Sequence, residues 1–436
     1  MPEAFPPEVL AEAAAVQPTL AGLDLTDVPF LTIDPEGSVD LDQAMALSRR
    51  DGGYRVQYAI ADVAAFVVAG GAIDTEAHRR GETLYAPDKR VPLHPTTLSE
   101  DRASLLEGQE RPALVWTLDL DATGALVATD VRRARVRSRR QLNYVEVQGQ
   151  IDEGSATSDL LLLREIGELR LARARDRGAV DLPSLEQEVD AHGHLTYRAP
   201  LPSEVWNAQI SLLTGMAAAT LMLDGKVGIL RTLPVPDPQA VTSLRRSALA
   251  LHVAWPEGAS YGDVLSGLDP HQPAAAALLT LATRLLRGAG YTAFDGSDPA
   301  QTLHSAVGAP YAHTTAPLRR LVDRYVGETC VALCAGAPVP SWVRTALPTL
   351  PEQMATADHR AHALDRAVID LAEALVLQHR VGEQFDGVVT DPKTVQVSDP
   401  AVRGSLQAQD PPVGTKVRVR LVSADVSARK VVFSLV

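Results

Sequence analysis

The hydrophobic pattern of the first part of the chain is that of short strands joined by tight turns. Phe30–Ile33 is a short apolar run with β-branched residues, as expected for a buried strand. Tyr54–Ala61 is a second such run, and it follows Asp51–Gly53, which is typical of a hairpin turn. Leu114–Asp121 and Leu126–Arg135 flank a further turn. The pattern therefore predicts that strands and hairpins dominate this part.

From about Ser158 the apolar positions recur with the helical period, and near the end of the chain the pattern returns to strands. The predicted helices are Pro7–Val16, Glu76–Arg80, a helix that starts near Ser158, Glu204–Leu223, Pro273–Arg287 and Asp358–His379. The late strands start near Val381 and include Thr394–Val397, Lys416–Val422 and Lys430–Leu435. We therefore predict an α+β chain with a short N-terminal helical segment (1–29), a mixed α/β body (30–380) and a small all-β module (381–436).

Composition narrows the class of protein. Hydrophobic residues make up 46% and charged residues 22% of the 436 residues, as in soluble globular proteins. Cys330 and Cys334 are too few for a disulfide framework or a zinc site, so we expect both to be small buried hydrophobes. The chain has no bilayer-length apolar run and no basic residue before Arg49, so we expect a cytoplasmic protein. No protein partner is indicated.

The formal net charge of −13 argues against general electrostatic attraction to nucleic acid or membranes, but a local basic channel remains compatible with it. Val131–Arg140 is the densest cationic run, and its arginines alternate with Ala and Val. This alternation predicts a strand with one basic face. Two interpretations stay open: a nucleic-acid contact, or a solvated edge strand protected by charge.

Three aspartates follow the first predicted strand. Asp34 ends the strand, a turn sequence follows, and Asp40 and Asp42 stand two positions apart, so in extended chain they share one face while Leu41 points to the other. Carboxylates this close repel unless a cation neutralises them, and Mg²⁺ prefers such oxygen ligands. The alternative is a solvated acidic turn or a surface calcium loop.

A second group of polar residues lies at Tyr311–Tyr325. Thr315 is a plausible helix N-cap, and Pro317 suits a first helical turn. Arg319 and Arg320 follow, so a helix N-terminus and two guanidinium groups together suit a phosphate. The alternative is that these arginines pair with a local carboxylate such as Asp323.

Both segments resemble one family. FLTIDPEGSVDLDQA is similar to the Asp-rich signature of the RNB catalytic domain of ribonucleases II and R, and YAHTTAPLRRLVDRY is similar to that family's Tyr-x-His-x-Thr-Ser-Pro-Ile-Arg-Arg-Tyr segment. Ala59–Val63, Gly81–Pro95 and His304–Gly308 match weaker family stretches in the same order. The resemblance covers roughly residues 25–380. The opening of the C-terminal module resembles an S1-type OB fold.

The resemblance implies a processive 3′→5′ exoribonuclease that hydrolyses single-stranded RNA to nucleoside 5′-monophosphates with Mg²⁺, or alternatively Mn²⁺. It implies that Asp34, Asp40 and Asp42 hold the metal ions, and that Asp40 and Asp42 support catalysis. Arg319 then stabilises charge on the phosphate, and Tyr85 stacks on a base. The remaining substrate contacts implied are Arg320, Tyr311 and His313.

Two departures from the family pattern weaken these expectations. Gln43 stands where the family usually has a fourth carboxylate, so it is at best a neutral metal ligand. The stretch before Phe30 is too short for the cold-shock barrels of larger members. In the small module, only Phe385 and Phe433 are available to stack on bases, so Lys416, Arg418 and Arg420 are the likelier RNA contacts. The alternatives are a catalytically weakened RNA-binding protein and a different metal-dependent phosphoesterase.

Overall fold

The structure is a computed structural model that describes residues 3–18, 22–86, 89–180, 186–189, 195–397, 399–407 and 411–436. Pro87, within the Gly81–Pro95 stretch, therefore lies outside the described residues. The chain divides into two compact units. Unit 1 consists of Met1–Arg177, Leu201–Thr232 and Ala289–Ala361, and unit 2 consists of Gly178–Pro200, Leu233–Gly288 and His362–Val436.

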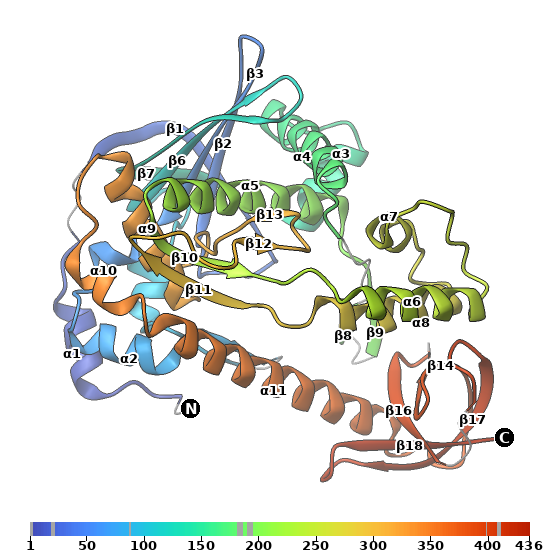
Figure 1. Cartoon of the computed structure of the whole chain (residues 1–436). Helices are drawn as coiled ribbons and strands as arrows, with labels where there is room; N and C mark the ends of the chain where they lie inside the picture. The colour runs from blue at the N-terminus through green and yellow to red at the C-terminus, as the bar shows by residue number, and fades with distance from the viewer. Residues whose placement is uncertain are drawn as a thin grey trace. The chain divides into compact units, whose positions relative to one another are not determined.

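Unit 1 is built on a closed five-stranded barrel (Figure 1). Its strands, in barrel order, are β1 (Leu23–Asp34), β2 (Gln43–Arg50), β3 (Gly53–Ala61), β6 (Glu110–Asp121) and β7 (Leu126–Asn143). Neighbours pair antiparallel except β1 and β7, which pair parallel and close the barrel. The predicted strands and hairpins of this region are confirmed, although β1 begins well before Phe30.

Helices and short strand pairs surround this barrel in unit 1. The helices are α1 (Pro7–Ala15), α2 (Ala72–Arg80), α3 (Tyr144–Asp152), α4 (Ser158–Asp176), α5 (Pro202–Asp224), α9 (Leu321–Cys334) and α10 (Ser341–Ala346), together with the start of α11 (Leu350–Leu377). The strand pairs are β4 (Leu84–Tyr85) with β5 (Arg90–Val91), β10 (Val227–Thr232) with β11 (Gly290–Asp295), and β12 (Leu303–His304) with β13 (Ala309–Pro310). None of the described helices is long and apolar enough to cross a bilayer.

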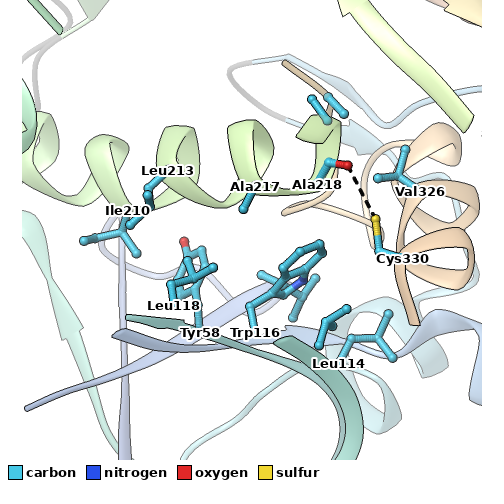
Figure 2. Packing of buried hydrophobic residues seen from close by; sticks show 14 of the residues in the cluster. Tyr58, Leu114, Trp116, Leu118, Ile210, Leu213, Ala217, Ala218, Val326 and Cys330 are labelled. Carbon is cyan, nitrogen blue, oxygen red and sulfur yellow. Dashed lines mark hydrogen bonds between the residues drawn. The ribbon is translucent and has the colours of Figure 1, made fainter. Parts of the chain in front are cut away.

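The core of unit 1 lies between the barrel and α5. Trp116 and Tyr58 are fully buried barrel side chains, and they pack in one cluster with Ile210 and Leu213 of α5 (Figure 2). Rings of this size supply much of the buried apolar area of a core. Cys330 is buried in the same cluster, as predicted, whereas Cys334 is only partly buried.

Unit 2 ends in a second closed five-stranded barrel, which confirms the predicted all-β module. Its strands, in barrel order, are β14 (Gln384–Asp391), β15 (Thr394–Val397), β16 (Val402–Gln407), β18 (Lys430–Leu435) and β17 (Lys416–Asp425). The rest of unit 2 contains β8 (Glu186–Val189), β9 (Leu195–Arg198), α6 (Pro238–Ala250), α7 (Tyr261–Ser266) and α8 (Pro273–Ala282). The prediction missed β16, although its residues alternate between buried and exposed.

The two phenylalanines of this module are not available to stack on bases. Phe385 and Phe433 are both buried and meet edge to face, with ring centroids 6.0 Å apart. Lys416, Arg418 and Arg420 do alternate on the exposed face of β17, but this strand pairs with β14 and β18 and is therefore not an edge strand. Phosphate contact by these cations stays a prediction.

The edge-strand interpretation of the basic run Val131–Arg140 is wrong, and contact of the run with nucleic acid stays a prediction. The run lies in β7, which pairs with β6 on one side and β1 on the other, so it is not an edge strand. Its arginines also have partners within unit 1. The ion pairs are Arg132 with Asp130, Arg133 with Asp62 and Glu328, Arg135 with Asp24 and Glu110, Arg137 with Glu110, Arg139 with Asp27, and Arg140 with Asp159. The run is therefore neutralised by the fold.

Candidate active site

One end of the unit 1 barrel gathers the acidic residues. Asp34 is the last residue of β1, Gln43 is the first of β2, and Ala61 is the last of β3. Asp34 also pairs across the barrel seam with Asn143, the last residue of β7 and the N-cap of α3. The chain between β1 and β2, residues 35–42, crosses this end, which brings Asp40 and Asp42 close to Asp34.

The crossing has the alternation predicted from its spacing. Leu41 is fully buried, its N–H donates to Ser104 Oγ at 2.9 Å, and its carbonyl accepts from Leu105 N at 3.0 Å. Asp40 and Asp42 lie on the other side, near Tyr85. The pKa of Tyr85 is raised mainly by burial of this residue, and the charges of Asp40 and Asp42 raise it further. The buried leucine therefore anchors the crossing and aims both carboxylates at the site.

Asp42 is the most buried of the three aspartates, with 3% of its surface exposed. Its Oδ1 accepts from the backbone N–H of Leu318 at 2.7 Å, and its Oδ2 lies 3.3 Å from Nε of Arg319. Burial raises the pKa of Asp42 to about 8, although Arg319 and the Leu318 N–H oppose the shift. The cost of burying the charge of the Asp42 carboxylate is therefore not fully offset by Arg319 and the Leu318 N–H.

Asp34 is in a similar condition. Burial raises its pKa to about 7; Arg319 opposes this and Asp40 adds to it. Its Oδ2 is buried and has no hydrogen-bond partner. Asp40 is better satisfied, because it accepts from Tyr85 OH at 3.0 Å and lies 3.3 Å from Nη1 of Arg90. The tyrosine predicted to stack on a base thus lies beside the carboxylates, and 45% of the surface of this residue is exposed.

Arg319 lies on an irregular segment, not on a helix. The predicted helix start at Thr315 and Pro317 is wrong, because α9 begins at Leu321 and Arg320 is its N-cap in an extended conformation. We call residues 314–320 the arginine loop. Its own backbone forms a single turn, in which the Ala316 carbonyl accepts from Arg319 N at 3.2 Å and Arg320 N at 2.9 Å. Side chains from other segments bond to further backbone groups of the loop, as described below. The Arg319 side chain remains 46% exposed beside Asp42.

Arg320 differs from its neighbour. Its guanidinium forms two hydrogen bonds to Asp323, each 2.9 Å long, so the alternative of local pairing is confirmed for Arg320. His313 Nδ1 is hydrogen-bonded with Tyr291 OH at 2.7 Å, and Tyr311 is mostly buried against the His313 ring. Substrate contacts of Arg320, Tyr311 and His313 stay predictions.

Two residues bear on the missing fourth carboxylate. Gln43 donates a hydrogen bond from Nε2 to the carbonyl oxygen of Thr315, which leaves Oε1 as the atom that could meet a metal. Asp62, a conceivable substitute, is buried and lies 2.9 Å from Nε of Arg133. Burial raises the pKa of Asp62, and Arg133 opposes this shift. Arg319, which acts on Asp34 and Asp42, is not among the causes of the Asp62 shift. Asp62 therefore belongs to a separate ion pair.

Sequence reasoning missed two residues at this site. Tyr144 begins α3 directly after Asn143; burial and the charge of Asp34 raise its pKa to about 12, and its hydroxyl accepts from Asn207 Nδ2 at 3.0 Å. Arg90 bridges Asp40 and Glu100. The sequence could have indicated Tyr144 only through its position directly after the last predicted strand of this region.

The donor chemistry of the site suits a divalent cation. Asp34 and Asp42 are buried carboxylates with raised pKa values, and one Asp34 oxygen has no partner, which is the environment that a cation with oxygen ligands would relieve. Among the described residues, no three His, Cys, Asp or Glu side chains are grouped closely enough to hold a metal ion as they stand. Arg319 is the positively charged group that partly offsets the charges of Asp34 and Asp42.

Comparison with known proteins identifies the two parts of the chain. A model of the RNB domain matches residues 23–334, and a model of the RNase II-type exonuclease C-terminal S1 domain matches residues 383–436. Exosome complex exonuclease RRP44 homolog A of Arabidopsis thaliana is 27% identical over 390 residues, which are 84% of this chain and 41% of that protein. Ribonuclease R of Thermotoga maritima is 26% identical over 421 residues, which are 89% of this chain and 58% of that protein.

Solved structures share the fold. Mycoplasma genitalium RNase R in complex with ribose methylated single-stranded RNA matches with a TM-score of 0.84 at 20% identity, over 99% of this chain and 73% of that one. Yeast Ssd1, described as a pseudonuclease, matches with a TM-score of 0.73 at 17% identity, over 98% of this chain and 54% of that one. Because the RNB model covers well over half of the chain, and the S1 model covers its last barrel, this protein belongs to the RNB family of ribonucleases II and R.

Proposed function

We propose that this protein is a processive 3′→5′ exoribonuclease that hydrolyses single-stranded RNA to nucleoside 5′-monophosphates. The observation that carries the proposal is the pair of buried, under-compensated carboxylates, Asp34 and Asp42, beside a half-exposed guanidinium at one barrel end. The family match and the exonuclease names of the relatives support the same activity. A cytoplasmic location, and the 30–380 and 381–436 domain limits, belong to this proposal.

The residues have separate roles in this proposal. Asp34, Asp40 and Asp42 hold divalent cations, with Mg²⁺ the first choice, Mn²⁺ the alternative, and Gln43 Oε1 a neutral further donor. Bound ions of this kind lower the pKa of water and neutralise charge that develops at phosphorus. Arg319 donates to the phosphate at the bond that breaks, where a guanidinium stabilises more charge in the transition state than in the ground state.

Tyr85 positions the end of the strand in this proposal. Its ring is exposed, while its hydroxyl donates to Asp40, so the ring is held in one place without being covered. Stacking on such a ring contributes about 1–3 kcal/mol per base and does not depend on the base, as an enzyme acting on any sequence requires. Single-stranded RNA is therefore the proposed substrate.

The test is a single-stranded RNA oligonucleotide with a 5′ label, incubated with the protein and Mg²⁺. The proposal predicts nucleoside 5′-monophosphates and labelled products that shorten from the 3′ end, and no loss of mononucleotides when EDTA is added first. Release of nucleoside 3′-monophosphates, or shortening from the 5′ end, would reject it. The unlabelled strand in excess, added after the start, separates processive from distributive degradation.

A second candidate function is RNA binding without catalysis. Gln43 in place of an acidic residue favours it, and the fold also occurs in a protein described as a pseudonuclease. This candidate predicts an RNA strand that stays intact in the same assay but is bound with an affinity that falls steeply as salt rises. A phosphoesterase acting on small substrates would show neither shortening nor salt-dependent binding.

A further inference from the structure

The backbone of the arginine loop is bonded to other parts of unit 1 at four residues. In chain order, the Thr315 carbonyl accepts from Gln43 Nε2, the Ala316 N–H donates to Asp323 Oδ1 (2.7 Å), and the Leu318 N–H donates to Asp42 Oδ1 (2.7 Å). The carbonyl of Arg319 accepts from the backbone N–H of Thr83 at 2.9 Å. The backbone position of the loop is therefore specified at both ends and at two residues between them.

The Thr315 carbonyl is held by a neutral donor. Gln43 must present its NH₂ group to Thr315, because its own oxygen would repel the carbonyl. This bond occupies Nε2 and leaves Oε1 as the atom proposed to meet a metal.

These contacts decide where Arg319 lies. Residues 314–318 are buried, whereas the Arg319 side chain is 46% exposed and lies 3.3 Å from Asp42. A long, half-exposed side chain samples many rotamers, so its average position follows its backbone. A shift of about 1 Å in a group that acts on a transition state can cost about 100-fold in rate.

We propose that Gln43 is a positioning residue: by holding the carbonyl group of Thr315, it places the Arg319 guanidinium over the aspartates. The proposal rests on the proposed function, in which Arg319 acts on the phosphate. It also explains what the glutamine contributes where the family pattern has an acid. The amide fixes the loop with Nε2, a bond that a carboxylate at this position would not form.

The main test compares Gln43→Met with a matched control, Gln57→Met, which changes a glutamine on the adjacent strand β3. Gln43→Met is expected to lower kcat about 10- to 100-fold with KM changed less than about twofold, because the loop loses its placement but not its substrate contacts. In an Arg319→Ala background the same substitution should change kcat less than about twofold, since it acts through Arg319. Equal losses in both backgrounds would overturn the proposal.

Gln43→Glu separates positioning from metal binding. A glutamate has nearly the same shape but turns an oxygen toward the Thr315 carbonyl. Positioning predicts a kcat at least about tenfold lower, with an unchanged Mg²⁺ concentration for half-maximal activity. A glutamine that acts mainly as a ligand predicts the opposite, namely a lower Mg²⁺ requirement and a higher rate. That result would overturn the role of Gln43.

Hydrogen–deuterium exchange gives a readout that does not need activity. In Gln43→Met, the peptide covering residues 314–320 should exchange at least about tenfold faster than in Gln57→Met, while peptides of β6 stay unchanged. If the wild-type protein fails to degrade RNA, the proposed function fails, and this exchange measurement alone decides whether Gln43 holds the loop. Unchanged exchange would overturn the proposal.

Discussion

The crossing (residues 35–42), together with Asp34 before it, and the basic run at 131–140 are both densely charged in sequence. The charges of the basic run are paired in the folded protein, whereas those of the aspartates are not fully compensated. The arginines of the run all have a carboxylate partner within unit 1. In the crossing, Asp42 is nearly inaccessible and one oxygen of Asp34 has no partner. The nearest cation to them, Arg319, is itself half exposed.

The difference teaches that charge density does not identify a binding site. A paired charge has no electrostatic need for a ligand, since its partner already supplies the interaction. A buried carboxylate without full compensation has a raised pKa, which is the usual sign of a functional site. The crossing meets this condition and the basic run does not.

The largest expected effect comes from Asp42→Asn. The amide keeps an oxygen to accept from Leu318 N–H but removes the charge, so we expect kcat to fall at least about 1000-fold, with RNA affinity changed less than about threefold. Single-turnover degradation and equilibrium binding measure the two quantities. The control, Asp130→Asn, removes the partner of Arg132 and should leave both unchanged. Equal loss of binding and turnover in Asp42→Asn would remove Asp42 from the chemistry.

Arg319→Ala is expected to have the next largest effect, a decrease in kcat of about 100- to 1000-fold, as for other donors that act on transition-state charge. Arg319→Lys keeps the charge but loses the planar fork, so its kcat should lie between those of the wild type and Arg319→Ala. Steady-state kinetics on one RNA oligonucleotide compares them. A change in KM alone would mean that Arg319 only binds the strand.

Stability should depend on pH with opposite sign in the two regions. The pKa of Asp42 is raised to about 8, mainly by burial, so the folded protein keeps a proton that the unfolded chain loses near its ordinary pKa of 3.8. In EDTA, this contribution to the free energy of unfolding falls as pH rises from about 4 to about 8, by on the order of 2 kcal/mol or more. Urea denaturation at several pH values should show this slope, and Asp42→Asn should flatten it.

Asp24, a partner of Arg135, gives the contrast for that measurement. Hydrogen bonds from Thr26, and then Arg135, lower the pKa of Asp24 to about 2. Its contribution to stability is therefore present above about pH 4 and is lost as pH falls toward 2. Asp24→Asn should lower the free energy of unfolding by a constant amount above about pH 4 and remove its change between about pH 4 and pH 2. An altered slope above pH 5 would contradict the assignment.

Tyr85→Ala should weaken RNA binding by about 1–3 kcal/mol, or roughly 5- to 150-fold in Kd, if its ring stacks on a base. Tyr85→Phe keeps the ring and loses only the bond to Asp40, so it should bind RNA within about threefold of the wild type. Fluorescence anisotropy with a labelled oligonucleotide, in EDTA to prevent cleavage, measures both. Equal loss in the two variants would assign the effect to the hydroxyl.

The smallest effect is expected in the basic run. Arg132→Ala and Arg135→Ala remove exposed members of ion pairs, so RNA affinity should change less than about twofold and its dependence on salt should stay the same. A decrease in the salt slope of about one for each arginine would show that β7 contacts phosphate, and the comparison would fail.

Much of this could be predicted from local pattern. The alternation around Leu41 identified the face on which Asp40 and Asp42 lie, and the apolar runs located most barrel strands. The helix start at Thr315 was wrong for a reason that local pattern does not contain. Capping residues and a proline favour a helix there. Gln43, however, donates to the Thr315 carbonyl, which would accept from the Arg319 N–H in a first helical turn, and the Arg319 N–H bonds to the Ala316 carbonyl instead.

By itself, the sequence determined which chemical groups are present and how each short stretch alternates between core and surface, because these depend on neighbours a few positions away. Tertiary structure alone decided which charges are neutralised and where Arg319 lies. The bonds responsible join residues 272 and 276 positions apart, Gln43 to Thr315 and Asp42 to Leu318. Compensation of a charge requires a partner within a few ångströms, and only the closed barrel brings such partners together.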